Sequence, residues 1–151
     1  MIRITRTDST NADFISLVKE LDADLAIRDG EDHAFYAQYN KIDLIKHVVV
    51  AYLDETPVGC GAIKEYSEGV TEVKRMYTNP DLRGKGIAST VLKELEKWAA
   101  ELHYSRCILE TGIKQPEAIA LYTKNSYHRI PNYGQYEGVL DSVCFEKVLT
   151  K

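Results

Sequence analysis

Cysteine, tryptophan, methionine and proline are all scarce in this chain. Its 151 residues include three cysteines, one tryptophan, two methionines and four prolines. Cys60, Cys107 and Cys144 lie far apart, are odd in number and form no C-x-x-C pair. This pattern argues against a disulfide framework and gives no reason to expect a metal site. We expect buried thiols in strands, as is typical of proteins from a reducing compartment.

Long apolar runs and a strong charge balance are also missing. No stretch approaches the roughly 20 apolar residues that a membrane-spanning helix needs. Residues 2–6 alternate between apolar and polar, which is unlike the apolar centre of a signal peptide. The net charge of -4 gives no reason to expect nucleic-acid binding, and it is mildly compatible with a cationic amine substrate. We therefore expect a cytoplasmic protein without nucleic-acid or membrane partners.

The remaining composition is that of an ordinary globular protein, with 44% apolar and 28% charged residues, and its length predicts a single domain spanning residues 1–151. Apolar residues recur at helical spacing after the cap residues near Asn11, after Gly86 and after Pro116. Strands are predicted at residues 2–6, 47–53, 58–66, 70–78, 106–111, 127–130 and 142–149. A turn is expected at Asp54-Glu55-Thr56-Pro57. Because a strand meander lies between the helices, this order predicts an α+β fold with a mixed sheet.

A glycine turn joins the strand at residues 70–78 to the next helix, with the sequence Arg83-Gly84-Lys85-Gly86-Ile87-Ala88. Glycines let the backbone turn sharply and approach a ligand closely. The first amides of the following helix have no partners inside it, and the helix dipole adds a positive end. Since Arg83 and Lys85 add charge nearby, the turn is suited to binding a phosphate group.

Two common phosphate-binding motifs do not fit this turn. A P-loop requires G-x-x-x-x-G-K-[ST], which Gly84-Lys85-Gly86 does not supply. A dinucleotide-binding G-x-G-x-x-G would need glycine at Ser89, and the preceding strands form a meander rather than a βαβ unit. These mismatches exclude a nucleotide kinase and a dehydrogenase. Taken alone, the two glycines also fit a plain connection between a strand and a helix.

The wider pattern resembles the GNAT superfamily of acetyltransferases. The resemblance begins at Glu72-Val73-Lys74-Arg75-Met76-Tyr77-Thr78 and runs through the glycine turn to Leu92. It resumes at Leu109-Glu110-Thr111-Gly112 and in the run from Gln115 to Tyr127. Together these segments cover about half of the chain.

Three positions depart from the family pattern. The family signature Q/R-x-x-G-x-G/A falls on residues 81–86, where its first position is Asp81. Gln115 stands where the family usually has Asn, and Ser126 where it usually has Gly. In the family, backbone amides do most of the pyrophosphate binding, so these departures leave the glycine turn intact.

The resemblance implies a fold, a cofactor and a reaction. The expected fold has three α/β/α layers, with a mixed, mainly antiparallel sheet of about six or seven strands and about four flanking helices. The implied enzyme is an acyltransferase that uses acetyl-CoA, releases CoA and acetylates an amine of a small molecule, amino acid or peptide. Many family members are dimers, and a homodimer is an open alternative for this chain.

The resemblance also implies a cofactor site. The strand end Met76-Tyr77-Thr78 would pair with pantetheine, and an amide near Met76 would polarise the thioester carbonyl. Lys124 would lie near the 3'-phosphate, although a solvated lysine is the alternative. The full set of implied cofactor contacts is Met76, Tyr77, Thr78, Arg83, Gly84, Lys85, Gly86, Ile87, Ala88, Ser89, Thr111, Gln115, Ala118, Tyr122 and Lys124.

Two residues are candidates for catalytic proton transfer. Tyr122 matches the general acid of the family, because a phenol can donate to a departing sulfur whose thiol pKa is about 8.5. The alternative is a tyrosine that packs its helix on the sheet. Glu72 matches a position where several members hold the base that an amine of pKa about 10.4 requires. The alternative is a strand carboxylate that faces solvent.

The acceptor wall is expected in residues 28–39, which form a loop or short helix, and in the loop at residues 131–136. The charges of Asp29, Glu31 and Asp32 could attract an amine, or they could belong to a solvated loop. The candidate acceptor-binding residues are Arg28, His33, Tyr36, Glu110 and Tyr133.

Direct attack of the amine in a ternary complex is the expected route, because no cysteine lies in a motif. The alternative function is a CoA-binding sensor or interaction module without turnover. The tyrosine at position 122 favours the enzyme.

Overall fold

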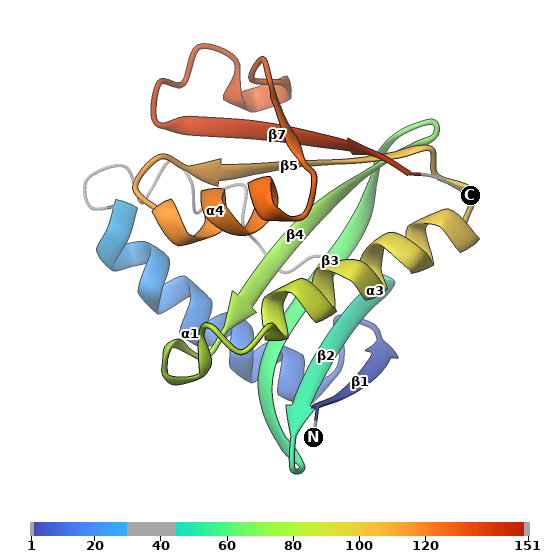
Figure 1. The fold of residues 1–151 in the computed structure, drawn as a ribbon, viewed down its shortest axis with the longest axis vertical. Helices are drawn as coiled ribbons and strands as arrows, with labels where there is room; N and C mark the ends of the chain where they lie inside the picture. The colour runs from blue at the N-terminus through green and yellow to red at the C-terminus, as the bar shows by residue number, and fades with distance from the viewer. Residues whose placement is uncertain (1, 30–44, 150–151) are drawn as a thin grey trace.

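The computed structural model describes residues 2–29 and 45–149, and it contains one seven-stranded sheet in the order β1-β2-β3-β4-β5-β7-β6 (Figure 1). Each strand lies within two residues of the predicted range. Neighbouring strands are antiparallel except for β4 and β5, which run parallel. The strands are β1 (Ile2–Thr7), β2 (His47–Leu53), β3 (Thr56–Ser67), β4 (Val70–Thr78), β5 (Arg106–Gly112), β6 (His128–Ile130) and β7 (Ser142–Val148).

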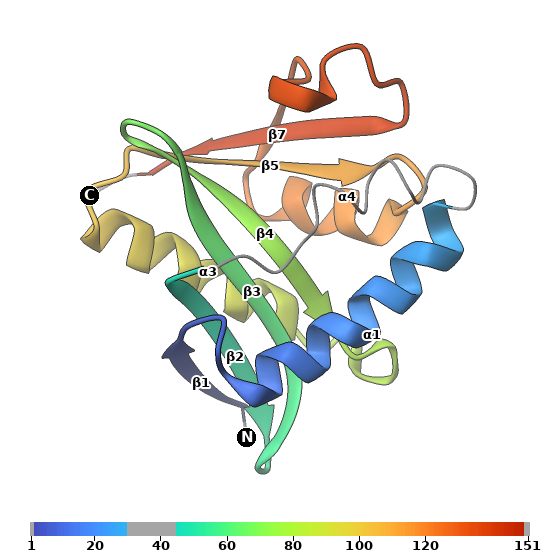
Figure 2. The same cartoon turned by 180° about the vertical axis from the view of Figure 1, so that it is seen from behind.

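Helices cover both faces of the sheet, which confirms the three-layer α+β fold (Figures 1 and 2). Helix α1 (Ala12–Asp29) packs on one face, and helices α3 (Ile87–Glu101) and α4 (Pro116–Lys124) pack on the other. Two short 3-10 helices, η2 (Pro80–Leu82) and η3 (Gly134–Tyr136), complete the described residues. Three α-helices are therefore described, against the four or so expected. None of the helices in the described ranges is long and apolar enough to cross a membrane.

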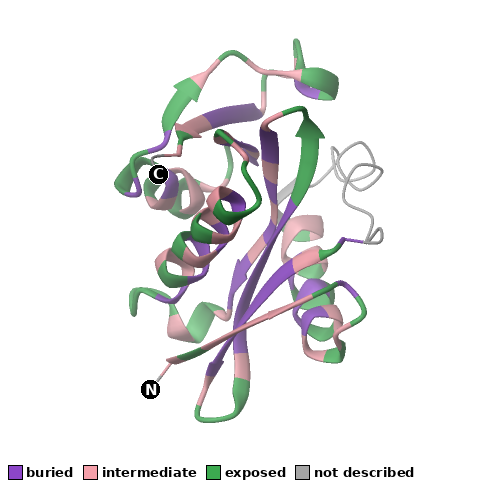
Figure 3. Ribbon diagram, turned by 90° about the vertical axis from the view of Figure 1, so that its right-hand side faces the viewer, coloured by how far each residue is buried: buried purple, intermediate pink, exposed green. Residues whose placement is uncertain are grey.

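The two larger apolar cores lie on opposite faces of the sheet. Figure 3 shows that burial concentrates in the central strands and on the helix sides that face them. The core beneath α1 includes Phe14, Leu17, Val18, Val48, Val50 and Cys60. The core beneath α3 and α4 includes Val73, Val91, Leu92, Leu95, Leu109 and Phe145. The predicted helical spacing thus identified the correct buried faces of α1 and α3. The helix residues in these cores recur about once per helical turn.

Local signals set the ends of several elements. Asn11 caps α1, because its Oδ1 accepts a hydrogen bond from the backbone N–H of Phe14 at 3.0 Å. The β2–β3 turn is shorter than predicted and contains only Asp54 and Glu55, with φ angles of 49° and 74°. Two residues with positive φ match the twist of the flanking strands, so pairing continues through Thr56.

Strands β4 and β5 form a fork, because they pair over only part of their length. They pair only from Val70 to Glu72, where Glu72 lies opposite Ile108. Beyond this point the two strands separate, as Figures 1 and 2 show. A bulge in β4, with Arg75 at a φ of 59°, accompanies the divergence. Residues of α1, β4, β5 and α4 line a cavity at this fork.

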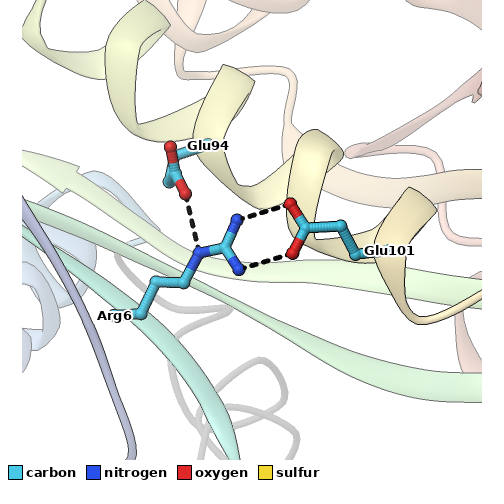
Figure 4. Close-up of polar contacts among 3 residues, drawn as sticks. All are labelled: Arg6, Glu94 and Glu101. Atoms are coloured by element: carbon cyan, nitrogen blue, oxygen red, sulfur yellow. Dashed lines mark hydrogen bonds and ion pairs between the residues drawn. The ribbon is translucent and has the colours of Figure 1, made fainter.

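A charged cluster fixes α3, whose first turn follows the glycine turn. Arg6 on β1 donates from Nε to Glu94 at 2.7 Å and from Nη1 and Nη2 to Glu101 at 2.8 and 3.0 Å (Figure 4). Its guanidinium also lies 4.8 Å from the centre of the Trp98 ring. Such paired contacts hold a helix in a defined orientation. The first strand therefore anchors the helix that begins at the candidate site.

Candidate active site at the strand fork

Two cavities meet at the fork between β4 and β5. The larger one, which we call the turn cavity, has a volume of about 300 Å³ and lies beside the glycine turn, α3 and α4. The smaller one, which we call the fork cavity, has a volume of about 110 Å³ and lies between α1, β4, β5, α4 and η3. The residues that line both cavities are Leu21, Met76, Gln115, Ala118 and Tyr122.

The glycine turn has the backbone that its sequence predicts. Gly84 and Gly86 have φ angles of 86° and 79°, which residues with a side chain rarely adopt. A Cβ built on either glycine would meet no atom within 4 Å, so space for a ligand lies beside them. Gly86 caps α3 without a side-chain bond, and the first helical bond joins the Thr90 N–H to its carbonyl at 3.0 Å. The amides of the first turn are therefore available to an anion.

The structure brings most of the predicted cofactor residues to the turn cavity. All of them line it except Lys85 and Thr111, and Thr111 lines the fork cavity instead. Sequence reasoning missed Leu21 and Asp24, because they come from α1 and belong to no motif. It also missed Leu82 in η2, as well as Glu117, Ala120 and Leu121 in α4, and these three could have been found from helical spacing.

Two of the departures from the family pattern have a structural explanation. Asp81 is exposed in η2 and lines neither cavity, and its backbone N–H donates to Asn79 Oδ1 at 2.9 Å. Ser126 adopts a φ of 74°, a conformation in which glycine is the least strained residue. The glycine turn itself is unaffected by either position.

Tyr122 is buried in α4 and borders both cavities. Its ring packs against Tyr127 and Phe145, with ring centres 5.7 and 6.0 Å away. Burial, and then the Glu110 carboxylate, raise the pKa of Tyr122 above its ordinary value. The phenol therefore keeps its proton at neutral pH. Tyr122 therefore packs against neighbouring rings and also borders both cavities at the fork.

Glu72 borders the fork cavity and holds a hydrogen bond with a residue from a distant loop. The Tyr133 hydroxyl donates to Glu72 Oε2 at 2.6 Å. Burial, followed by the charge of Glu72, raises the pKa of Tyr133, so the hydroxyl remains a donor. The Tyr133 ring also meets Tyr66 and Tyr136 edge to face. Glu72 is thus held in place rather than simply facing solvent.

The predicted acceptor residues divide into two groups. Glu110 and Tyr133 lie near Glu72, because Glu110 lines the same cavity and Tyr133 bonds to Glu72. The side chain of Arg28, together with His33 and Tyr36, lies outside the described residues.

Arg75 lines the fork cavity, and sequence reasoning missed it. Its side chain is only 2% exposed, and its Nη1 donates to Asp22 of α1 at 2.9 Å. Strand alternation would send Arg75 to the side of Val73, which lies in the core beneath α3. The bulge turns it toward α1 instead, and the local sequence carries no signal of that bulge.

Comparisons with known proteins agree with this geometry. The model of the acetyltransferase (GNAT) family matches residues 14–127. The chain is 33% identical over 152 residues to the IAA acetyltransferase of Azospirillum brasilense, covering 98% of each protein. It is 36% identical over 85 residues to the uncharacterized N-acetyltransferase YjgM of Escherichia coli, covering 54% of this chain and 50% of that protein.

Solved structures show the same fold. A Klebsiella pneumoniae protein assigned as an acyl-CoA N-acyltransferase superposes with a TM-score of 0.82 and 34% identity, covering 99% of each chain. The PaiA N-acetyltransferase of Thermoplasma acidophilum, solved with coenzyme A, gives a TM-score of 0.73 at 19% identity, covering 98% of this chain and 99% of that one. The chain therefore belongs to the GNAT family of acetyltransferases, and it is an acyltransferase that uses an acyl-CoA donor.

Proposed function

We propose that this protein moves the acetyl group of acetyl-CoA to a primary amine of a small molecule, amino acid or peptide. The observation that carries the proposal is the meeting of the two cavities at Tyr122 and Met76. A donor held in the turn cavity and an amine held in the fork cavity would approach each other through the opening between β4 and β5. Both would have to be bound at the same time.

The residues of the turn cavity fit the donor. The amides at the start of α3 and the open space beside Gly84 and Gly86 suit a pyrophosphate. Thr78 Oγ1 is buried and has no hydrogen-bond partner within residues 2–29 and 45–149, so it can bond to a ligand. Lys124 lines the same cavity and would hold a further phosphate. Acetyl-CoA, when bound, supplies an acetyl group activated as a thioester.

The proposed proton transfers use residues from both cavities. Glu72 would accept the proton that the amine loses, directly or through water, and the Tyr133 hydroxyl would keep that carboxylate in place. Tyr122 would give its proton to the departing sulfur, and its raised pKa ensures that the phenol is protonated beforehand. The backbone N–H near Met76 would polarise the thioester carbonyl.

The cysteines support direct attack by the amine. Cys60, Cys107 and Cys144 are buried and free, as the sequence predicted. Burial raises the pKa of Cys60 and Cys107 to about 12, and that of Cys144 to about 11. A thiol that stays protonated at neutral pH is a poor nucleophile, so these cysteines are unsuited to carrying an acyl group.

A screen of amines with acetyl-CoA tests the proposal. Release of free thiol would be followed for each amine, with a reaction lacking amine as the control for hydrolysis. We expect release above the control with at least one class of primary amine. Tight binding of acetyl-CoA without release for any amine would contradict the proposal and favour a CoA-binding module.

A further inference from the structure

The buried guanidinium of Arg75 has unused hydrogen-bonding capacity. Its Nη1 is engaged with Asp22. Its Nε and Nη2 atoms are buried but have no hydrogen-bond partner among the residues that the structure describes. Unpaired buried donors are costly, particularly on a charged group. Arg75 lines the fork cavity, so a ligand that fills this cavity lies beside the residue.

The two unused atoms define the shape of that ligand. Nε and Nη2 lie on one edge of the planar guanidinium, and their N–H groups point in parallel. Such an edge matches the two oxygens of a carboxylate, which can accept both hydrogen bonds at once. Asp22 occupies the other side of the group, so it holds Arg75 in place without blocking this edge.

The fork cavity also contains groups of the opposite charge. Glu72 and Glu110 line it together with Arg75. A simple amine would use only the carboxylates, and it would leave the guanidinium edge unpaired. A ligand with an ammonium group and a carboxylate would match both charges. A doubly charged phosphate is a poorer fit, since Glu72 and Glu110 would repel it more strongly.

We propose that the acceptor is an amine that also carries a carboxylate, which binds to the Nε and Nη2 edge of Arg75. This inference rests on the proposed function, and it narrows the acceptor to amino acids and related amino carboxylates. The bulge in β4 is what makes the site, because it turns Arg75 away from the core beneath α3 and toward α1. Arg75 is then a specificity residue rather than a proton donor or acceptor.

Matched acceptors test this inference on the unaltered protein. Each amino acid in a panel would be compared with its carboxamide and its aminophosphonate analogue at saturating acetyl-CoA, with kcat/KM corrected for the fraction of free amine. We expect the carboxylate to be preferred by about 10- to 100-fold over the carboxamide, as charged hydrogen bonds of this kind suggest. Equal rates for acid and amide, or a preference for the phosphonate, would overturn the inference.

Variants locate the preference at Arg75. Arg75→Gln should raise KM for the carboxylate acceptor by about 10-fold or more and leave the carboxamide nearly unchanged, which removes the discrimination. Arg75→Lys keeps the positive charge but loses the two parallel N–H donors of the guanidinium. It should therefore retain part of the discrimination. Arg3→Gln is the control, because it removes the same charge at a residue that lines neither cavity. Arg3 is exposed on β1 beside Glu55.

The outcomes separate this inference from the proposed function. If no amine releases thiol, the proposed function fails. If amines react but acid and amide are used equally well, only the carboxylate site fails. If Arg75→Gln melts at a much lower temperature, the comparison of matched acceptors on the unaltered protein still decides. Discrimination that survives in a folded Arg75→Gln protein would contradict the role of Arg75.

Discussion

The turn cavity and the fork cavity are built in different ways. Most of the turn cavity comes from two stretches of chain, residues 76–89 and 115–124, and its central feature is a backbone conformation at two glycines. The fork cavity is lined by residues 72–76 of β4 and 110–112 of β5, together with residues from α1, α4 and η3. The conformation of the glycine turn can be predicted from its own sequence, whereas the meeting of side chains from five elements in the fork cavity cannot.

The chemistry of the two cavities differs in the same way. The turn cavity offers backbone amides at the start of α3, so binding of a phosphate there should not depend on the side chain at position 81. The fork cavity offers charged side chains, among them Glu72, Arg75 and Glu110. Substitutions in the fork cavity should therefore change the preference among acceptors without weakening acetyl-CoA binding. Substitutions in the glycine turn should weaken acetyl-CoA binding without changing the preference among acceptors.

The largest expected effect is at Tyr122, where the two cavities meet. Tyr122→Phe should lower kcat by about 100-fold or more with little change in acetyl-CoA binding, because only the donated proton is lost. Burial raises the pKa of Tyr122, so its ionisation should cause no loss of kcat between about pH 7 and pH 9. Steady-state kinetics across pH would measure both.

Tyr104→Phe is the matched control, since Tyr104 carries a hydroxyl bonded to Glu65 on the surface and lines neither cavity. Full turnover by Tyr122→Phe would show that another group protonates the sulfur.

Glu72→Gln should have the next largest effect, and it should be confined to the acceptor side. Loss of the proposed base should lower kcat/KM for the amine by about 100-fold. The dissociation constant of acetyl-CoA should stay unchanged, because Glu72 lines only the fork cavity. Tyr133→Phe should cause a smaller loss, since it removes the 2.6 Å hydrogen bond but keeps the carboxylate. A parallel loss of acetyl-CoA binding in Glu72→Gln would break the distinction between the cavities.

Gly86→Ala tests the donor side. A side chain at a φ of 79° costs about 1 kcal/mol or more, and relief of that strain should turn the first amides of α3. We expect KM for acetyl-CoA to rise about tenfold, with an unchanged preference among amines. Gly138→Ala is the control, because Gly138 has a φ of 76° and open space around it but lines neither cavity. An equal rise in both variants would point to general strain.

The smallest expected effect is on stability alone. Ser126→Gly should relieve the left-handed conformation at this position, offset in part by the greater freedom of glycine in the unfolded chain. The net gain in the free energy of unfolding should be about 0.5 to 1 kcal/mol. Denaturant unfolding would measure it, and both KM values should stay the same. A lower stability would show that the serine side chain makes a contact that outweighs the strain.

The sequence predicted the local structure well where one short segment carries the signal. All seven predicted strands are present, and α1 begins at Ala12, directly after the group of possible cap residues at positions 7–11. The sequence predicted the β2–β3 turn at the correct place but made it two residues too long. Pro57 was counted in the turn, although proline is also compatible with a strand that pairs on one side at that point. The positive φ angles at Asp54 and Glu55 depend on the twist of both strands, which their residue types do not fix.

The sequence by itself determined the family, the layer order and the glycine turn at Gly84 and Gly86. Hydrophobic periodicity and the need for glycine at positive φ are properties of short segments, so they can be read without coordinates. Only the tertiary structure decided that β4 and β5 part after Glu72, that Tyr133 reaches Glu72, and that the bulge turns Arg75 toward the fork cavity. These features depend on how distant elements pack, and no single segment of the chain encodes them.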